Sequence, residues 1–393
     1  MIRPACIALA LSLVSAVARA QPVPPISVPP APPVAPQPML IELVPGTVQC
    51  DDGIGPDAVE PVRLEQPFPV RMVGQPGWSV APMRVQFRID AQGRPFGISQ
   101  AAIVAPAPMT GGGRFFYTGS DLMPALAASR FAAGQARDRC SMTMAARAFT
   151  ANEAPVALVR RYLVSPHSRG WGEEAFFRRA HPADSDCFGA GSPKVRLRAM
   201  PVFETIPIEP GGRAYAMVGF DIDRQGRPIG VRIVESDGNP ALDRASVDSV
   251  RRSRFAPEAR QGCTYPYRRT SEVPLPAPAT PDKATLTPAD ARCPAADTAW
   301  LSMPRLVFPR GFATRRVEGW AVIGYDVAPW GQTGNVRVLA AEPAAAFGDR
   351  AREIVTGARQ APSAAGRSGC VDLVRFVMPK PGREDAEDEA EVE

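Results

Sequence analysis

The chain has 393 residues with a formal net charge of +5, and 45% of its residues are hydrophobic. At roughly 150 residues per domain, this length predicts two or three domains and excludes a single small module. The hydrophobic fraction is that of an ordinary globular protein, which excludes wholesale disorder and a polytopic membrane protein. Proline is the outlier, because its 45 residues are about twice the usual share and gather between the segments expected to fold.

Residues 1–20 have the pattern of a secretory signal peptide. Arg3 supplies the positive charge, the apolar run Ala5–Ala18 follows, and the segment ends in ARA, the small-x-small pattern of a cleavage site. The mature chain is then expected to begin at Gln21 and to be exported. The alternative is an uncleaved anchor in the inner membrane, although the apolar run is shorter than a bilayer core requires. No later segment reaches 18 consecutive apolar residues, so we expect no further membrane span.

Two stretches outside the expected folded body differ from it in composition. Residues 21–38 are rich in proline, which favours extended polyproline II over a packed core. Residues 383–393 are dominated by acids and predict a solvated, disordered tail. Without the tail the body is basic, but its arginines are scattered and an exported protein has little access to nucleic acid, so we expect no nucleic-acid partner.

One twelve-residue segment recurs along the chain. FRIDAQGRPFGI (Phe87–Ile98) and FDIDRQGRPIGV (Phe220–Val231) agree at eight of twelve positions without a gap. YDVAPWGQTGNV (Tyr325–Val336) keeps the aromatic start, the central glycine and the final valine. The copies lie 133 and 105 residues apart, which are the spacings of whole domains. The sequence therefore predicts three tandem domains, over residues 39–150, 151–278 and 279–382.

The second copy predicts a β-hairpin. Tyr215–Ile222 alternates so that Ala216, Val218, Phe220 and Ile222 share an apolar face, as in a half-buried strand. Asp223–Gly226 has the residues of a tight turn, in which Gly226 can adopt the positive φ that the reversal needs. Ile229–Val234 is expected to return as the second strand.

A helix and a last strand are expected to complete the unit. Asn239 suits the N-cap of the helix and Pro240 suits its first position. Leu242, Ala245, Ser249 and Val250 are expected to form its inward stripe. The last strand is expected at Cys263–Val273. The corresponding helices of the other two copies are expected at Asp121–Phe131 and Phe347–Ala358. The fold class is therefore predicted to be α+β, with three tandem small domains, each an antiparallel sheet (strand-strand-helix-strand) with one helix packed on it.

The cysteines repeat with the same period. Cys6 lies in the signal segment, and six cysteines can pair in fifteen ways. The repeats select one of these, because each unit has one cysteine upstream of its first strand and another at the start of its last strand. We therefore predict one disulfide per domain, as expected in an oxidising compartment. The predicted pairs are Cys50 with Cys140, Cys187 with Cys263, and Cys293 with Cys370.

No group of residues predicts catalysis, a metal site or a cofactor. The two histidines, His167 and His181, fall in a linker-like stretch around Pro155–Pro182 and are expected at the surface. Asp90 and Asp223 recur beside the two turns, where capping of the turn explains them. The run Gly111–Gly113 lacks the Lys-Ser/Thr of a phosphate loop, and no CxxC motif indicates a redox site. The protein is expected not to be an enzyme.

The run FDIDRQGRPIGVRIVESDGNPALDRASVDSVRRSRFAP (Phe220–Pro257) resembles the carboxy-terminal domain of the TonB family of energy transducers. The ending RFAP, followed shortly by Gly262, is similar as well. The third copy adds PRLVFP (Pro304–Pro309), a proline-flanked aromatic that the family carries upstream of its first strand, and VEGWAVIGYDV (Val317–Val327) as that strand. The first copy is similar mainly through its hairpin. The resemblance covers about half of the mature chain.

The resemblance implies a periplasmic location in a Gram-negative bacterium. It also implies that the last strand binds a short extended peptide from an outer-membrane receptor, by adding a strand to a sheet edge. A further implied partner, if the amino terminus is not cleaved, is an inner-membrane complex driven by protons. By position the binding strand is Thr264–Val273, in which Pro266 lacks an N–H and weakens the edge. The partner-binding residues expected there are Thr264, Tyr265, Tyr267, Arg268, Arg269 and Thr270.

Two functions from different classes remain open. Transducers of the family keep an uncleaved amino-terminal helix and a long proline-rich spanner, whereas this chain has an apparent signal peptide and the short stretch Pro22–Pro38. The first function is a part in TonB-type transport across the cell envelope. The alternative is a secreted periplasmic scaffold or interaction protein that uses TonB-like domains without energy coupling.

Overall fold

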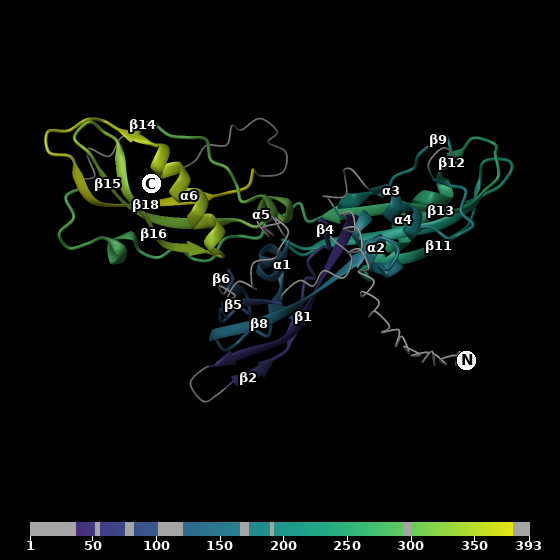
Figure 1. Ribbon diagram of the computed structural model, residues 1–393, viewed down its shortest axis with the longest axis horizontal. Coiled ribbons are helices and arrows are strands. Elements are labelled where there is room, and N and C mark those ends of the chain that lie inside the picture. The colour runs from purple at the N-terminus through teal and green to yellow at the C-terminus, as the bar shows by residue number, and fades with distance from the viewer. Residues whose placement is uncertain are drawn as a thin grey trace, which may run out of the picture. The chain divides into compact units, whose positions relative to one another are not determined.

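The computed structural model describes residues 37–51, 56–74, 82–100, 121–165, 173–188, 192–293 and 300–379. The expected signal peptide, nearly all of the proline-rich stretch, the triple glycine, His167 and the acidic tail lie outside these residues. Within them the chain is a mixture of mostly antiparallel sheets and a few helices, as expected for the α+β class (Figure 1). None of the helices in the described ranges is long and apolar enough to cross a membrane.

The first sheet has the strand order β2-β1-β8-β5-β6, and β4 pairs with the beginning of β1. All of these pairings are antiparallel. A short pair, β3 with β7, and the helix α1 complete the region. The strands are β1 (Gln37–Asp51), β2 (Pro56–Val59), β3 (Pro61–Arg63), β4 (Val70–Gly74), β5 (Met83–Ile89), β6 (Pro95–Gln100), β7 (Arg130–Phe131) and β8 (Arg137–Thr150), and α1 is Leu122–Ala128.

The second sheet has the order β11-β10-β13, with α4 packed on one face. A short pair, β9 with β12, lies beside it, and two helices precede it. The elements are α2 (Val156–Leu163), α3 (Glu173–Ala180), β9 (Val195–Leu197), the 3-10 helix η2 (Phe203–Thr205), β10 (Arg213–Ile222), β11 (Pro228–Ser236), α4 (Pro240–Arg252), β12 (Arg254–Phe255) and β13 (Arg260–Thr270).

The third sheet repeats this order as β16-β15-β18, with α6 on one face and the short pair β14 with β17. A loop that includes the 3-10 helix η3 covers part of the other face, where Leu286 packs beside Trp320 and Leu373. The elements are η3 (Lys283–Leu286), β14 (Trp300–Ser302), α5 (Arg310–Arg315), β15 (Gly319–Val327), β16 (Thr333–Glu342), α6 (Ala345–Gly357), β17 (Arg359–Gln360) and β18 (Arg367–Phe376).

The turn of the second hairpin forms as predicted. Gly226 has a φ of 78°, and a Cβ at this position would lie 2.2 Å from the carbonyl oxygen of Phe255, so only glycine fits. The Asp223 carboxylate accepts hydrogen bonds from the backbone N–H groups of Gln225 and Arg227 at 2.9 and 2.8 Å. Asp90 makes the same two bonds in the first hairpin. Both aspartates are therefore turn-capping residues.

The helix α4 also begins where the sequence predicts. The Asn239 side chain accepts from the N–H groups of Ala241 and Leu242, and Pro240 is the first helical residue. Its buried stripe contains Leu242, Ser246, Ser249 and Val250. Ser246 thus takes the fully buried position that the sequence assigned to Ala245, which is only half-buried.

The short strands that follow each helix were missed. The helix expected at Asp121–Phe131 ends at Ala128, because Arg130 and Phe131 pair with β3. The strands β12 and β17 make the equivalent pairings with β9 and β14. Each of these pairings fixes the chain after its helix, and two-residue strands have no periodicity from which to predict them.

The stretch around Pro155–Pro182 is not a linker, contrary to the prediction. It forms α2 and α3, whose buried side chains include Leu158, Tyr162 and Phe176. They pack with Met217 of β10, on the face of the second sheet opposite α4. Both faces of this sheet are therefore covered, although the alternation of β10 predicted a single buried face.

Three disulfides join the cysteines in the predicted pairs. The later cysteine of each pair lies in β8, β13 or β18, the third strand of its hairpin-helix-strand unit. The loops that they close span 76 to 90 residues. Each bond is expected to stabilise the fold by about 2–4 kcal/mol, chiefly by restricting the unfolded chain.

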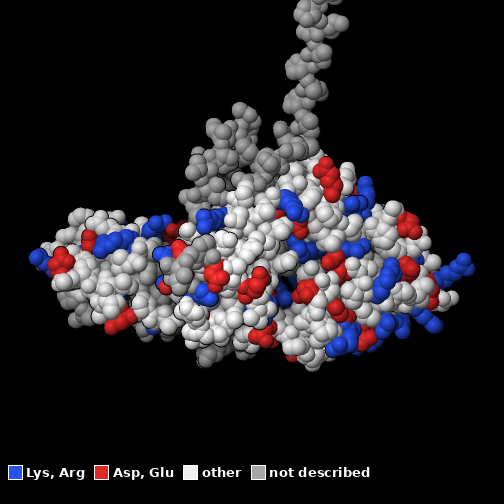
Figure 2. Space-filling view, turned by 90° about the horizontal axis from the view of Figure 1, so that it is seen from below, with Lys and Arg blue, Asp and Glu red and all other residues white. Residues whose placement is uncertain are grey.

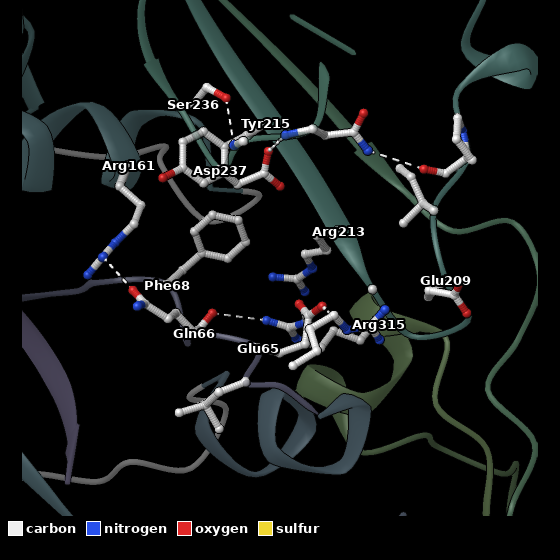
Figure 3. A pocket seen from close by; sticks show the side chains of 17 residues that line it. Glu65, Gln66, Phe68, Arg161, Glu209, Arg213, Tyr215, Ser236, Asp237 and Arg315 are labelled. Atoms are coloured by element: carbon white, nitrogen blue, oxygen red, sulfur yellow. Dashed lines mark hydrogen bonds and ion pairs between the residues drawn. The ribbon is translucent and has the colours of Figure 1, made fainter. Parts of the chain in front are cut away.

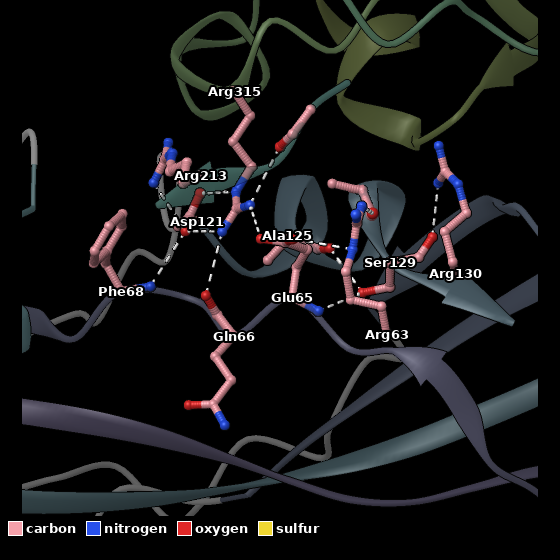
Figure 4. Close-up of polar contacts among 12 residues, drawn as sticks. Arg63, Glu65, Gln66, Phe68, Asp121, Ala125, Ser129, Arg130, Arg213 and Arg315 are labelled. Carbon is pink, nitrogen blue, oxygen red and sulfur yellow. Dashed lines mark hydrogen bonds and ion pairs between the residues drawn. The ribbon is translucent and has the colours of Figure 1, made fainter. Parts of the chain in front are cut away.

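A buried arginine ties distant parts of the chain together (Figure 4). Arg315, at the end of α5, is only 1% exposed. Its Nε and Nη2 donate to the two carboxylate oxygens of Asp121 at 2.7 and 2.8 Å, and its Nη1 donates to Glu65 at 2.9 Å. It also donates to the carbonyl oxygens of Gln66 and Gly211. One side chain thus links α1 and the segment after β3 to the turn before β10.

Candidate functional site

The strand β13 lies at an edge of the second sheet. It pairs with β10, and no other strand of the described residues pairs with it. The six residues expected to bind a partner all fall within it (Thr264, Tyr265, Tyr267, Arg268, Arg269 and Thr270). The strand ends at Thr270 rather than at the expected Val273, because the backbone N–H of Ser271 bonds to Gly212 and its hydroxyl donates to the carbonyl of Val273. The candidate edge is therefore the segment from Thr264 to Thr270.

The odd-numbered side chains of β13 face α4. Tyr265 and Tyr267 pack against each other with ring centroids 4.9 Å apart, and both contact the core under α4. Arg198 donates to the Tyr265 hydroxyl at 2.7 Å and lies over its ring. The Arg269 guanidinium lies 5.6 Å from the ring centre of Phe203. A strand added at this edge would thus meet aromatic rings bordered by arginines.

The even-numbered side chains face the helices on the opposite side. The Thr264 hydroxyl lies 3.0 Å from Nε2 of His181, whose Nδ1 lies 2.7 Å from the carbonyl oxygen of Phe177 in α3. Arg268 donates to the carbonyl of Ser165 at 2.8 Å. The His181 side chain therefore bridges α3 and β13. It is half-buried rather than a free surface residue.

Pro266 shows which way the backbone of β13 points. It lies opposite Met217 of β10 and has no N–H to donate. Proline within a sheet is confined to positions whose N–H would face away from the ladder. Thr264 and Arg268, two residues away on either side, share that orientation, so we expect their N–H groups to point to the open edge.

The beginning of β13 is already covered. Asp186 donates its N–H to the carbonyl of Gln261 at 3.3 Å and accepts the Gln261 N–H at 2.8 Å through its carboxylate. The disulfide from Cys187 to Cys263 closes the same end. In the third sheet, a contact of the same kind joins Arg292 to Ser368 of β18. In both sheets, the described residues around the earlier cysteine therefore touch the edge strand at its start.

In the first sheet the equivalent edge carries a complete strand. There β8 pairs with β5 on one side, as β13 pairs with β10, and with β1 on the other. The register of β1 on β8 runs from Met39 opposite Thr150 to Cys50 opposite Cys140. The chain thus adds a strand of its own at the position that stays open on β13. The sequence analysis missed β1, although the apolar run from Met39 to Val44 was a usable signal.

Surface charge on the face shown in Figure 2 and metal-binding groups in the described ranges give no second candidate for the partner-binding surface. Basic and acidic side chains lie interspersed on the face shown in Figure 2 rather than in a patch of one sign. No group of three or more histidine, cysteine or acidic side chains in the described ranges is placed to hold a metal ion.

The comparison with known families bears on this edge. Residues 210–275 match the family model described as Gram-negative bacterial TonB protein C-terminal. The second sheet and α4 are TonB-like. The match starts just before β10 and ends just after β13, so the whole candidate edge lies inside the TonB-like segment. No curated protein matches the chain.

Proposed function

We propose that this protein is a periplasmic envelope protein that binds extended peptide segments of outer-membrane receptors, or of other envelope proteins, by strand addition to β13. It thereby takes part in TonB-type transport across the envelope. Its role is binding rather than catalysis. The support is an open edge inside the TonB-like segment, where unpaired backbone groups can bind an extended peptide.

The observation that carries this proposal is the pairing of β1 with β8. It is strand addition at the equivalent edge, made within the same chain, in antiparallel register over more than ten residues. A third strand of this fold can therefore hold a neighbour on its outer side without losing its pairing to the hairpin.

The domain organisation belongs to the same proposal. Three tandem TonB-like domains, over residues 39–150, 151–278 and 279–382, would follow an exported, cleaved signal peptide. The order of two strands, a helix, a short strand and a long strand recurs three times, each time with one disulfide, and this recurrence supports the proposal.

Site-specific cross-linking in cells tests the edge. A photo-reactive phenylalanine analogue replaces Arg268 or Thr270 on β13, and the matched control replaces Arg232 on β11, the opposite edge of the same sheet. We expect adducts with outer-membrane receptors from the β13 positions and none from β11. Adducts of equal yield at both edges, or none at β13, would contradict strand addition at this strand.

The mature amino terminus shows whether the chain can also contact an inner-membrane complex driven by protons. Sequencing of the isolated protein is expected to give Gln21 if the signal is cleaved. Retention of residue 1 would instead favour an anchored chain that can contact an inner-membrane, proton-driven complex. If envelope proteins other than receptors are the adducts at β13, the scaffold function is favoured.

A further inference from the structure

A pocket of about 590 Å³ lies beside Arg315 (Figure 3). One wall is the segment from Arg63 to Phe68, and the other is the start of β10 together with the loop that precedes α4. Arg213 and Tyr215 of β10 and the ring of Phe68 line its centre. The pocket therefore combines aromatic surface with buried arginine.

On one side of this pocket, the buried acidic side chains are paired with arginines. Arg315 holds both oxygens of Asp121 and one oxygen of Glu65, and Arg63 also pairs with Glu65. Burial alone raises the pKa of Asp121, but the adjacent arginines outweigh it and hold the pKa below its usual value. The carboxylates of this cluster therefore have their cations without a ligand.

Arg213 has more unpartnered donors than the other arginines of the pocket, two rather than at most one. Its side chain is 6% exposed, and its one hydrogen bond to a described residue is a 3.2 Å bond from Nη1 to an oxygen of Asp121 that Arg315 already holds. The buried Nε and Nη2 have no hydrogen-bond partner among the described residues. Buried, unpaired donors of a charged group are costly, and burial accordingly lowers the pKa of Arg213 to about 10.

We propose that this pocket binds an organic carboxylate, whose two oxygens accept from Nε and Nη2 of Arg213 while its apolar body packs against Phe68 and Tyr215. Two parallel N–H donors on one guanidinium match the planar fork of a carboxylate. Glu209 and Asp237 also line the pocket, and their negative charges disfavour a doubly charged phosphate. The carboxylate can come from a free acid or from the end of a peptide chain.

Phe68 controls access to these donors. Its ring centre lies 4.8 Å from Cζ of Arg213, and the two free nitrogens are not exposed to solvent. A ligand therefore reaches them by displacing this ring, and the adjacent pocket gives the ring space to turn. Binding would replace a cation–π contact by charge-assisted hydrogen bonds, which are the stronger interaction in a buried site.

Paired acids and amides test the proposal on the folded, exported chain. The probes are N-acetylphenylalanine and its amide, and a short peptide ending in phenylalanine with a free or an amidated carboxyl terminus. Calorimetry is expected to show binding of the acids and at least about tenfold weaker binding of the amides. Binding of the acetylated amino acid indicates a free acid as the source, whereas binding of the free-ended peptide alone indicates a chain terminus. Equal binding of acid and amide, or no binding of either acid, overturns the proposal.

The variant Arg213→Gln supplies a second test, with Arg251→Gln on the exposed face of α4 as the matched control. We expect the first to lose at least about tenfold in affinity for the acids and the second to bind as the native chain does. Without ligand, Arg213→Gln is expected to melt at or above the native temperature, because it removes buried unpaired donors. Unchanged acid binding in a folded Arg213→Gln chain contradicts the proposal. If that variant does not fold, the acid and amide comparison on the native chain decides.

Discussion

The first and second sheets differ in what occupies the outer side of their third strand. In the first sheet β1 covers β8 along nearly its whole length, whereas in the second sheet the part of the chain that the structure describes covers β13 at its start, through Asp186 and Cys187. Both have a hairpin on the inner side and a disulfide to an upstream cysteine. The difference lies in the segment before the cysteine, which is an apolar strand in one case and the helical pair α2 and α3 in the other.

The contrast is that this edge holds a full strand in the first sheet, whereas no full strand of the described residues occupies it in the second. Whether a full strand occupies the edge depends on the segment that precedes the earlier cysteine of the disulfide. A strand from the same molecule adds without the loss of translational freedom that a separate partner suffers, so β1 is permanent. A partner of β13 has to overcome that loss, which suits a reversible contact.

The largest expected effect is that of removing the side chain that links the two regions. Arg315→Met removes the closest cation of buried Asp121 and Glu65 and leaves them the longer contacts of Arg213 and Arg63, and we expect a loss of about 3–5 kcal/mol of unfolding free energy. Chemical denaturation measures it, with the exposed Arg310→Met on the same helix as control. An unchanged midpoint would show that the two sheets are not held together by this cluster.

Truncation of a buried side chain in β1 tests whether this strand contributes to the hydrophobic core of the first sheet. Leu43 is 3% exposed, and Leu43→Ala is expected to cost about 2–5 kcal/mol. Val273, just beyond β13, is 58% exposed, and Val273→Ala is expected to change stability by less than about 0.5 kcal/mol. Similar losses at the two positions would erase the contrast between a filled edge and an open one.

Restoring the backbone N–H at position 266 tests whether the outer side of β13 binds a peptide. Pro266→Ala gives β13 one more outward N–H, and a net gain of about 0.5–1.5 kcal/mol predicts roughly two- to tenfold tighter binding of a cross-linked partner peptide. The control is Pro228→Ala at the start of β11, on the opposite edge. Fluorescence anisotropy with a labelled peptide measures both, and equal affinity for Pro266→Ala and the native chain would place the peptide elsewhere.

The smallest expected effect is a dependence of the unfolding free energy on pH in the acidic range. The pKa of Asp121 is lowered in the folded chain by Arg315 and Arg213, against the effect of burial. Its contribution to stability is therefore present above the unfolded pKa of about 4 and is lost as the pH falls below that value. The slope of unfolding free energy between pH 2 and 5 is expected to be shallower in Asp121→Asn, and an equal slope would contradict the assignment.

The local features of the fold could be predicted from the sequence, because their causes are local. Gly226 and Asp223 specify a turn, Asn239 and Pro240 specify a helix start, and the repeat period selects the cysteine pairs. The open edge of the second sheet followed from the resemblance rather than from any residue pattern.

The features that depend on distant contacts could not be predicted. Nothing near Arg315 in the sequence indicates that its partners are Asp121 and Glu65, 194 and 250 residues away. The helices α2 and α3 lie among prolines and arginines that are typical of a linker, and they become buried because distant residues, Leu40, Phe68 and Met217, pack against them. The pocket at Arg213 has the same origin, since its walls come from segments far apart in the chain.

The way β1 enters the fold gives it a mechanical property. Met39, near its beginning, lies opposite Thr150, where β8 ends, so the chain enters and leaves this pair at the same end. Tension between the amino terminus and the rest of the molecule would open the pair one residue at a time, as a zipper opens. The opening would stop at the Cys50–Cys140 bond, after a release of about 40 Å of extended chain. The disulfide would therefore set the limit to which β1 can be drawn out.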